Sequence, residues 1–259
     1  MDIYITRPRC GRDSSVHPTS PLDLLEASAT VARWKVHATL FRTGEPAEFW
    51  YRVVAGGLRK CVFAADGSRQ VVDFLRPGDL LGFDSPTIHE FSVEAIMPGT
   101  SVACYSRRSA EQLANSELCV ASWVRDLAVA SMTRAQRRSV ALGRATPSER
   151  VSHFLLEMGE RYGALRANAF RLPMSRYDIA DYLALAVESV SRALTGLRTQ
   201  GVIRFDSVRS LRICDRPALE RASEGLLSVV DSRQTCVRPL GMRGRMSRGL
   251  APLFPGTEA

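Results

Sequence analysis

The stretch LPMSRYDIADYLALAVESVSRALTGLRTQGVIRF, residues 172–205, has the pattern of two helices joined by a tight turn. Ser175 can cap the first helix, because Asp178 stands three residues later and completes a shorter form of the capping box. Residues 184–186 form the predicted turn. Apolar residues then recur at helical spacing and define the buried face of the second helix: Val187, Val190, Leu194 and Leu197. The stretch therefore predicts a helix-turn-helix.

The opposite face of the second predicted helix is polar and carries Glu188, Ser191, Arg192, Thr195 and Thr199. A helix that presents such a face from its N-terminal half can read base edges in the major groove of DNA. An ordinary solvated helix face explains the composition equally well. The pattern alone therefore leaves both interpretations open.

Glu188 is an unexpected residue on a surface that would meet phosphates. Arg192 can donate two hydrogen bonds to guanine, and Glu188 can accept one from cytosine N4. The two residues are four positions apart, so their side chains can also pair. Because a carboxylate repels a base edge that offers only an acceptor, we interpret Glu188 as a residue that sharpens sequence choice. The predicted base-reading residues are Glu188, Ser191 and Arg192.

Other side chains near this stretch are suited to the DNA backbone. The chain of 259 residues carries a formal net charge of +8, which favours a polyanionic partner, nucleic acid before membrane. Arginines on phosphates supply affinity that falls with salt, and they add little sequence choice. The predicted backbone contacts are Ser175, Arg176, Ser189, Arg198 and Arg209, and Arg204 is suited by residue type.

The first part of the chain has the pattern of strands and turns. Asp66-Gly67 lies between two apolar runs, which is a strong hairpin signal. Alternation at period two is visible in Phe49, Tyr51 and Val53. Residues 21–108 are therefore predicted to form a β-roll, or jelly roll, that a short helix precedes. Residues 1–20 are polar and proline-bearing, and we expect a loose arm there.

A long helix is predicted over residues 109–140, and it has two apolar stripes. The first stripe consists of Val120, Trp123, Leu127 and Ala130. The second contains the predicted dimer contacts Val124, Ala128, Met132 and Ala135, together with Ala121. A face this broad suggests burial on two sides, against the β-roll and against a second subunit. A central core helix of a monomer is the alternative.

The C-terminal domain is predicted over residues 142–220. It begins with an amphipathic helix over 142–163, in which Thr146 is a plausible N-cap and Pro147 suits the first turn. Two short strands are expected to follow the helix-turn-helix, at 202–205 and 211–214. Residues 221–259 form a basic tail that we expect to be largely disordered.

Several classes of function are disfavoured by the sequence. The six cysteines lie far apart and none forms a CxxC, which argues against a zinc site and a disulfide framework. No signal peptide or apolar run of membrane-spanning length is evident, so we expect a cytoplasmic location and no membrane partner. The chain offers no nucleophile–base pairing, metal-ligand cluster or phosphate-cradling glycine loop, so we do not expect an enzyme.

Residues 40–220 resemble the CRP/FNR superfamily of bacterial regulators, and they look closest to its FixK branch. The resemblance rests on GLRKCVFAADGSRQVVDFLRPGDLLGFDSP, SERVSHFLLEM and RYDIADYLALAVESVSRALTGLRTQGVI. It implies an α+β fold, with a cyclic-nucleotide-binding-type β-roll, a long dimerisation helix and a winged helix-turn-helix. It also implies a homodimer that binds double-stranded DNA and contacts RNA polymerase.

The same resemblance implies a DNA site. FNR and FixK members use a Glu-x-x-Ser-Arg motif to read a TTGAT…ATCAA-type palindrome, and here that motif is Glu188, Ser191 and Arg192. Val187 stands where the cyclic-AMP branch has an arginine, which favours the FNR-like site. The family turn usually ends in Thr or Ser, but Ala186 stands here and lacks the capping hydroxyl, a loss of about 1 kcal/mol.

The departures from the family concern cofactors. In the segment that binds the cyclic phosphate, cyclic-AMP binders have a Gly-Glu pair and then an Arg-Ser pair. The corresponding segment here is LLGFDSPTIHEFSVEAI, residues 80–96, in which Phe83 follows Gly82 and no arginine is present to bind the phosphate. An iron–sulfur cluster of the FNR type needs four thiolates, but Cys10 stands alone near the N-terminus and Cys104 resembles the distal ligand. We therefore expect neither cofactor. Cys104 stays a candidate redox thiol, and a haem on His89 or His37 is disfavoured, because a lone histidine is usually structural.

We expect a dimeric, sequence-specific transcription regulator, an activator, that acts without an evident small cofactor. The alternative is a ligand- or redox-sensing module whose output is protein contact. In that case Ala184 and Ala186 would have weakened DNA binding.

Overall fold

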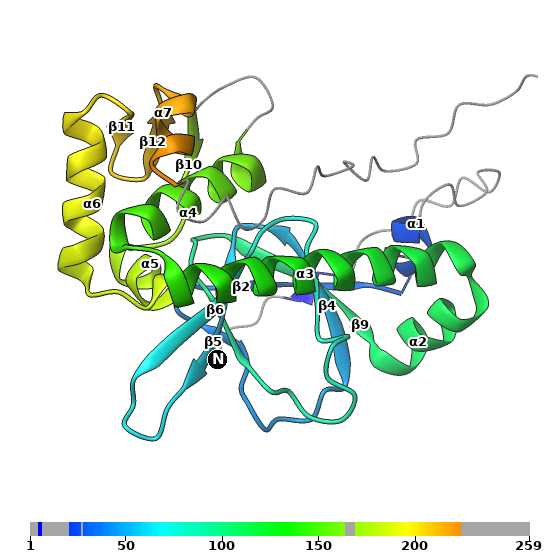
Figure 1. The fold of residues 1–259 in the computed structure, drawn as a ribbon. Helices are drawn as coiled ribbons and strands as arrows, with labels where there is room; N and C mark the ends of the chain where they lie inside the picture. Colours follow the sequence, from blue (N-terminus) through cyan, green and yellow to red (C-terminus); the bar gives the residue numbers. More distant parts are fainter. Residues whose placement is uncertain (1–4, 7–20, 27, 164–168, 224–259) are drawn as a thin grey trace, which may run out of the picture.

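The structure is a computed structural model, and it describes residues 5–6, 21–26, 28–163 and 169–223. An antiparallel β-roll comes first, a long helix runs along it, and a smaller helical domain with its own sheet follows (Figure 1). This order of parts confirms the predicted α+β class. None of the described helices is both long and apolar enough to cross a bilayer.

The β-roll consists of two sheets. One has the strand order β1-β2-β9-β4-β7 and the other β3-β8-β5-β6, and neighbouring strands are antiparallel. The core of the roll is fully buried and includes Val53, Leu58, Val93 and Val102. The elements are β1 Ile5–Thr6, α1 Pro21–Glu26, β2 Thr30–Trp34, β3 Thr39–Phe41, β4 Phe49–Ala55, β5 Leu58–Phe63, β6 Arg69–Leu75, β7 Leu80–Leu81, β8 Ser92–Ala95 and β9 Thr100–Ser106.

The predicted hairpin at Asp66-Gly67 is confirmed, because β5 and β6 pair directly on either side of it. Gly67 has a φ of 83°, a conformation that glycine adopts without a Cβ penalty. The expected loose arm is wrong at Ile5–Thr6, which form strand β1 against β2. Backbone pairing with an edge strand is the physical reason. The rest of the arm, residues 1–4 and 7–20, lies outside the described residues.

The single helix predicted over 109–140 is wrong, because the structure has two helices there. Helix α2 covers Arg107–Ser116 and α3 covers Leu118–Arg144, and Glu117 between them is extended, with φ −112° and ψ 105°. The break lets the chain reverse, so that Ala110 of α2 and Val120 of α3 enter the same buried cluster on the roll. A continuous helix could not place both residues there.

The C-terminal domain contains α4 Pro147–Tyr162, β10 Ala169–Arg171, α5 Arg176–Leu183, α6 Val187–Thr199, β11 Ile203–Ser207, β12 Ser210–Ile213 and α7 Arg216–Arg221. Thr146 caps α4 through a full capping box with Glu149, as predicted. The expected two-stranded element has a third strand, β10, in the order β10-β12-β11. Helix α7, which the sequence did not predict, lies within the predicted domain except for its last residue, Arg221. Residues 224–259 lie outside the described part.

The two domains share one apolar core. Phe74 of β6 packs against Phe154 of α4 and Tyr182 of α5, with ring centroids 6.4 and 5.2 Å away. All three rings belong to one buried cluster that also holds Val71 and Ile96 of the roll. The helix-turn-helix is therefore docked on the β-roll and does not hang from a free linker.

Candidate DNA-binding interface

Helix α5 is the first helix of the helix-turn-helix, and its capping box is formed as predicted. The backbone N–H of Asp178 donates to Ser175 Oγ at 3.1 Å, and the backbone N–H of Ser175 donates to Asp178 Oδ2 at 2.9 Å. Asp178 is only 4% exposed. Its pKa is lowered from the usual value, because hydrogen bonds from Ser175 and the charges of Arg59 and Arg69 outweigh the opposing effect of burial.

The turn after α5 has alanine at two special positions: one has a left-handed backbone and the other is the N-cap of α6. Ala184 has φ 50° and ψ 52°, the left-handed region that glycine tolerates better than alanine. Ala186 is the N-cap of α6, with φ −68° and ψ 145°, and no side chain caps the helix there. The expected missing cap at Ala186 is therefore confirmed.

Helix α6 separates its apolar and polar residues on opposite faces. Val190, Leu194 and Leu197 are buried in the domain core, as predicted. Glu188, Arg192, Thr195 and Thr199 are exposed, and Ser191 is half-buried. In Figure 1, α6 forms one end of the molecule, across the direction of α3, with no described helix or strand on its outer side. The structure therefore places the three predicted base-reading residues on one accessible face.

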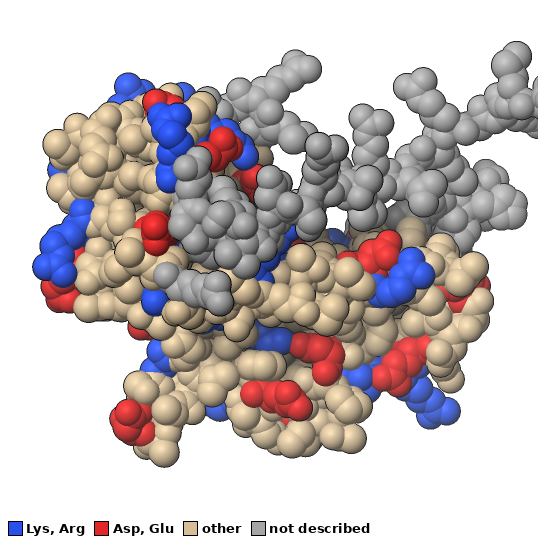
Figure 2. All heavy atoms as spheres, viewed as in Figure 1, with Lys and Arg blue, Asp and Glu red and all other residues tan. Residues whose placement is uncertain are grey.

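The side chains on this face do not pair as the sequence suggested. Arg192 Nη2 donates to Ser189 Oγ at 3.3 Å, and among the described residues Glu188 has no hydrogen bond or ion pair. An exposed carboxylate in the first turn is favoured by the partial positive charge of the helix N-terminus. The Glu188 carboxylate is thus available to an external partner, and Arg192 keeps its remaining guanidinium N–H groups for one. Figure 2 shows acidic and basic atoms side by side at the outer edge that α6 forms.

The predicted backbone contacts are only partly free. Arg176 Nη1 donates to Ser191 Oγ at 3.3 Å, which brings a predicted phosphate contact beside a predicted base reader. Arg198 and Arg209 are exposed. Arg204 is ion-paired with Asp206 at 3.0 Å, so part of its charge is already neutralised. The hydroxyl of Ser175 is engaged in the α5 cap, and Ser189 accepts from Arg192.

The two apolar stripes of α3 are only partly buried against the roll. Val120, Trp123 and Leu127 of the first stripe pack on the roll, whereas Ala130 of that stripe is exposed. Val124, a predicted dimer contact, is half-buried and also packs against the roll. Met132 is 55% exposed, Ala135 is exposed and Ala128 is half-buried. Sequence reasoning missed two further exposed apolar residues on α3, Leu118 and Val129.

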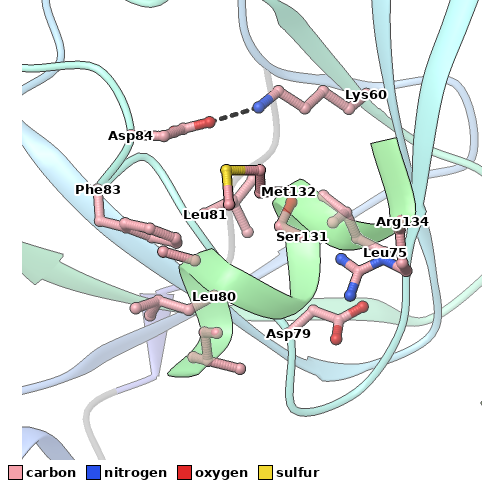
Figure 3. A pocket seen from close by; sticks show the side chains of 12 residues that line it. Lys60, Leu75, Asp79, Leu80, Leu81, Phe83, Asp84, Ser131, Met132 and Arg134 are labelled. Atoms are coloured by element: carbon pink, nitrogen blue, oxygen red, sulfur yellow. Dashed lines mark hydrogen bonds and ion pairs between the residues drawn. The ribbon is translucent and has the colours of Figure 1, made fainter. Parts of the chain in front are cut away.

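A pocket of about 160 Å³ lies between the β-roll and α3 (Figure 3). Its two cations are already paired: Lys60 Nζ with Asp84 Oδ2 at 2.5 Å and Arg134 Nη2 with Asp73 Oδ2 at 3.1 Å. Asp79 adds a carboxylate to the lining. The volume is below the roughly 300–1,000 Å³ of ordinary small-molecule sites. The residues present therefore do not fit an anionic cyclic nucleotide.

The other candidate cofactor and redox residues lie at different depths in the β-roll: His89 is buried, Cys104 is half-buried and His37 is exposed. Burial raises the pKa of the Cys104 thiol to about 11, which disfavours the reactive thiolate and weakens the case for a redox role. His89 is buried and stacks on Phe41, with ring centroids 3.6 Å apart, and burial lowers its pKa. His37 has a φ of 67° in the turn after β2. Within the described ranges, no three His, Cys, Asp or Glu side chains form a potential metal site.

Comparisons with known proteins agree with this architecture. Residues 31–117 match the Cyclic nucleotide-binding domain family, and residues 149–222 match the Crp-like helix-turn-helix domain family. The chain is 38% identical to the nitrogen fixation regulation protein FixK of Azorhizobium caulinodans, over 81% of this chain and 84% of that protein. It is 36% identical to FixK of Rhizobium meliloti, over 73% of this chain and 85% of the relative.

A solved structure, FixK2 from Bradyrhizobium japonicum, superposes with a TM-score of 0.71 at 38% identity, and the match covers 75% of this chain and 96% of FixK2. The relatives are named as regulators, and the matched domains are those that the β-roll and the helix-turn-helix form. The chain therefore belongs to the CRP/FNR superfamily of transcription regulators, in its FixK-like branch, and its DNA-binding domain is the helix-turn-helix of α5 and α6.

Proposed function

We propose that this protein is a homodimeric transcription activator that reads a TTGAT…ATCAA-like palindrome. The observation that carries the proposal is the outward face of α6, where Glu188 and Arg192 are both exposed and Arg192 uses only one guanidinium nitrogen, for Ser189. Arg192 donates two hydrogen bonds to guanine, and Glu188 accepts from cytosine N4. Ser191, which lies between them in the sequence, contributes a hydroxyl held near Arg176.

The dimer forms along α3. Exposed apolar side chains follow this helix, with Leu118 83% and Met132 55% exposed, and Val129 lies between them in the sequence. Their burial against a second copy is favourable by about 25 cal/mol for each Å² of apolar surface. A two-fold axis along α3 places both α6 helices at the same end of the dimer, as successive major grooves require.

The protein acts without a bound cyclic nucleotide or iron–sulfur cluster, and it is not an enzyme. Lys60 and Arg134 of the pocket beside α3 are already paired with carboxylates, which supports the absence of a bound cyclic nucleotide. As a DNA-binding regulator it works in the cytoplasm, and it activates transcription by touching RNA polymerase. Phosphate contacts come from Arg176, Arg198 and Arg209, which supply affinity that depends on salt.

Selection of bound DNA from a random pool, under reducing and oxidising conditions, tests the proposal. We expect one palindrome under both conditions, because Cys104 is half-buried and burial raises the pKa of its thiol to about 11, which disfavours the reactive thiolate. Recovery of no preferred palindrome would support the alternative function, an output through protein contact with DNA binding weakened at Ala184 and Ala186. A palindrome recovered in only one redox condition would instead assign the signal to a thiol.

Titrations of two variants separate base reading from backbone contact. Arg192→Ala should abolish discrimination between the selected palindrome and scrambled DNA, because the bidentate donor to guanine is lost. Arg176→Ala should weaken binding to both DNAs and lower the slope of log affinity against log salt by about one unit. Arg108→Ala is the matched control, because Arg108 is exposed on α2 at the opposite end of α3.

A further inference from the structure

Helix α5 is held at its C-terminal end by side chains from three other elements. The last carbonyls of a helix lack partners within the helix. Here the carbonyl of Asp181 accepts from Gln70 of β6, that of Tyr182 accepts from Arg138 of α3 at 3.0 Å, and that of Leu183 accepts from Arg150 of α4 at 3.2 Å. The end of this helix is thus attached to the roll, to α3 and to its own domain.

Helix α5 is also attached to the roll by ion pairs. Asp178 Oδ1 accepts from Arg59 Nη1 at 2.6 Å and from Arg69 Nη2 at 2.9 Å. Arg69 Nη2 also donates to Asp181 Oδ2 at 2.6 Å. The Arg59 and Asp178 side chains are only 9% and 5% exposed. The roll therefore binds the carboxylate that completes the α5 capping box.

Arg138 connects the three elements at one point. Besides Tyr182, its guanidinium donates to the carbonyls of Val71 at 2.7 Å and Val72 at 2.8 Å, both on β6. It also lies over the Tyr182 ring, 4.4 Å from the centroid. These acceptors are neutral carbonyls on two different domains. Arg138 is therefore placed to fix the angle between α3 and α5.

We infer that Arg59, Arg69, Gln70 and Arg138, which we call the α5 clamp, are positioning residues that set the half-site spacing this regulator accepts. The inference rests on the proposed homodimer. With α3 along the two-fold axis, the clamp fixes each α6 relative to that axis through the helix-turn-helix. Buried ion pairs add little net stability but can specify one arrangement over others. A fixed arrangement matches one separation of half-sites.

The clamp differs from the DNA contacts in a measurable way. Its arginines are buried or half-buried between domains and have protein partners, so they do not neutralise phosphates. Weakening the clamp should leave the salt slope and the affinity for scrambled DNA unchanged. It should change how strongly the binding affinity depends on the spacing between the two half-sites, because each added base pair rotates one half-site by about 35° relative to the other.

The test uses the full-length protein and palindromes whose spacer is the selected length or one or two base pairs longer or shorter. Wild-type affinity should fall about tenfold or more on a change of one base pair. Arg138→Lys keeps the charge but loses the planar guanidinium fork, whose three nitrogens reach three separate carbonyls. In Arg138→Lys and in Arg69→Gln, the fall in affinity on a change of one base pair should be about threefold or less. Arg108→Ala is the control and should behave as wild type.

The outcomes separate the clamp from the proposed function. A wild-type protein with no spacing preference contradicts the homodimer that reads a palindrome. Wild-type selectivity that both variants retain, with dimer mass and thermal unfolding unchanged, overturns the clamp. Loss of binding to every DNA by folded, dimeric variants also overturns it, because the residues would then maintain the helix-turn-helix itself. Should Arg138→Lys fail to fold, Arg69→Gln decides, because Arg69 lies on the edge strand β6 and is less buried.

Discussion

Removing the charge of Asp178 should destabilise the folded protein more than its small change in shape suggests. Asp178 uses one oxygen, Oδ2, for the N–H of Ser175 and the other, Oδ1, for Arg59 and Arg69. Asparagine has a single acceptor oxygen. If that oxygen keeps the cap, the amide N–H donors face two guanidiniums, which are also donors.

The expected loss in Asp178→Asn follows from these contacts. Removing one partner of a buried ion pair costs about 3–5 kcal/mol. The lower end of this range applies, because each arginine keeps another ion pair in the variant: Arg59 with Glu94 at 2.5 Å and Arg69 with Asp181 at 2.6 Å. We expect the free energy of unfolding to fall by about 3 kcal/mol. Asp178→Ala should lose about 1 kcal/mol more, because the backbone N–H of Ser175 also loses its acceptor in the capping box.

Urea denaturation at pH 7 measures this change. The variants are compared at one protomer concentration, because the stability of a dimer depends on concentration. Asp126→Asn is the matched control, since Asp126 pairs with Arg125 on the surface of α3 and both side chains are more than half exposed. The control should change by no more than about 0.5 kcal/mol. An equally small loss in Asp178→Asn would refute the reasoning.

Three further predictions follow from other features. The difference in free energy of unfolding between wild type and Asp178→Asn should shrink as pH falls through the ordinary Asp pKa of 3.8 and below, because a carboxylate whose folded pKa is lowered loses its contribution on protonation. Urea curves between pH 6 and pH 3 measure this difference, and a constant value would contradict the prediction. Ala186→Ser should supply the missing α6 cap and add about 1 kcal/mol, visible as a higher Tm, whereas Ala184→Ser should add nothing. Met132→Glu should raise the Kd of the dimer about 100-fold or more, measured by sedimentation, because it buries an unpaired charge in the proposed interface. An unchanged Kd would exclude α3 as the interface, and Ser109→Glu on α2 is the control.

The sequence by itself determined the local structure of the DNA-binding unit. The Ser175–Asp178 box, the apolar face of α6 and the hairpin at Asp66-Gly67 were all predicted correctly. Each depends on residues a few positions apart, whose spacing already fixes which groups meet. The outward placement of Glu188 and Arg192 follows for the same reason, because a helix that buries Val190 must expose the residues opposite it.

Only the tertiary structure decided how these units are joined. Three features depend on contacts with distant segments that local spacing does not specify. They are the break at Glu117, the third strand β10 and the packing of Val124 on the roll. The contact between Arg59 and Asp178 spans 119 residues of chain. Many arginines and carboxylates in the chain could make such a pair, and the packing of β6 against α5 selects these two. Long-range burial of charge, rather than helix or strand pattern, therefore fixes how the β-roll holds the DNA-binding helices.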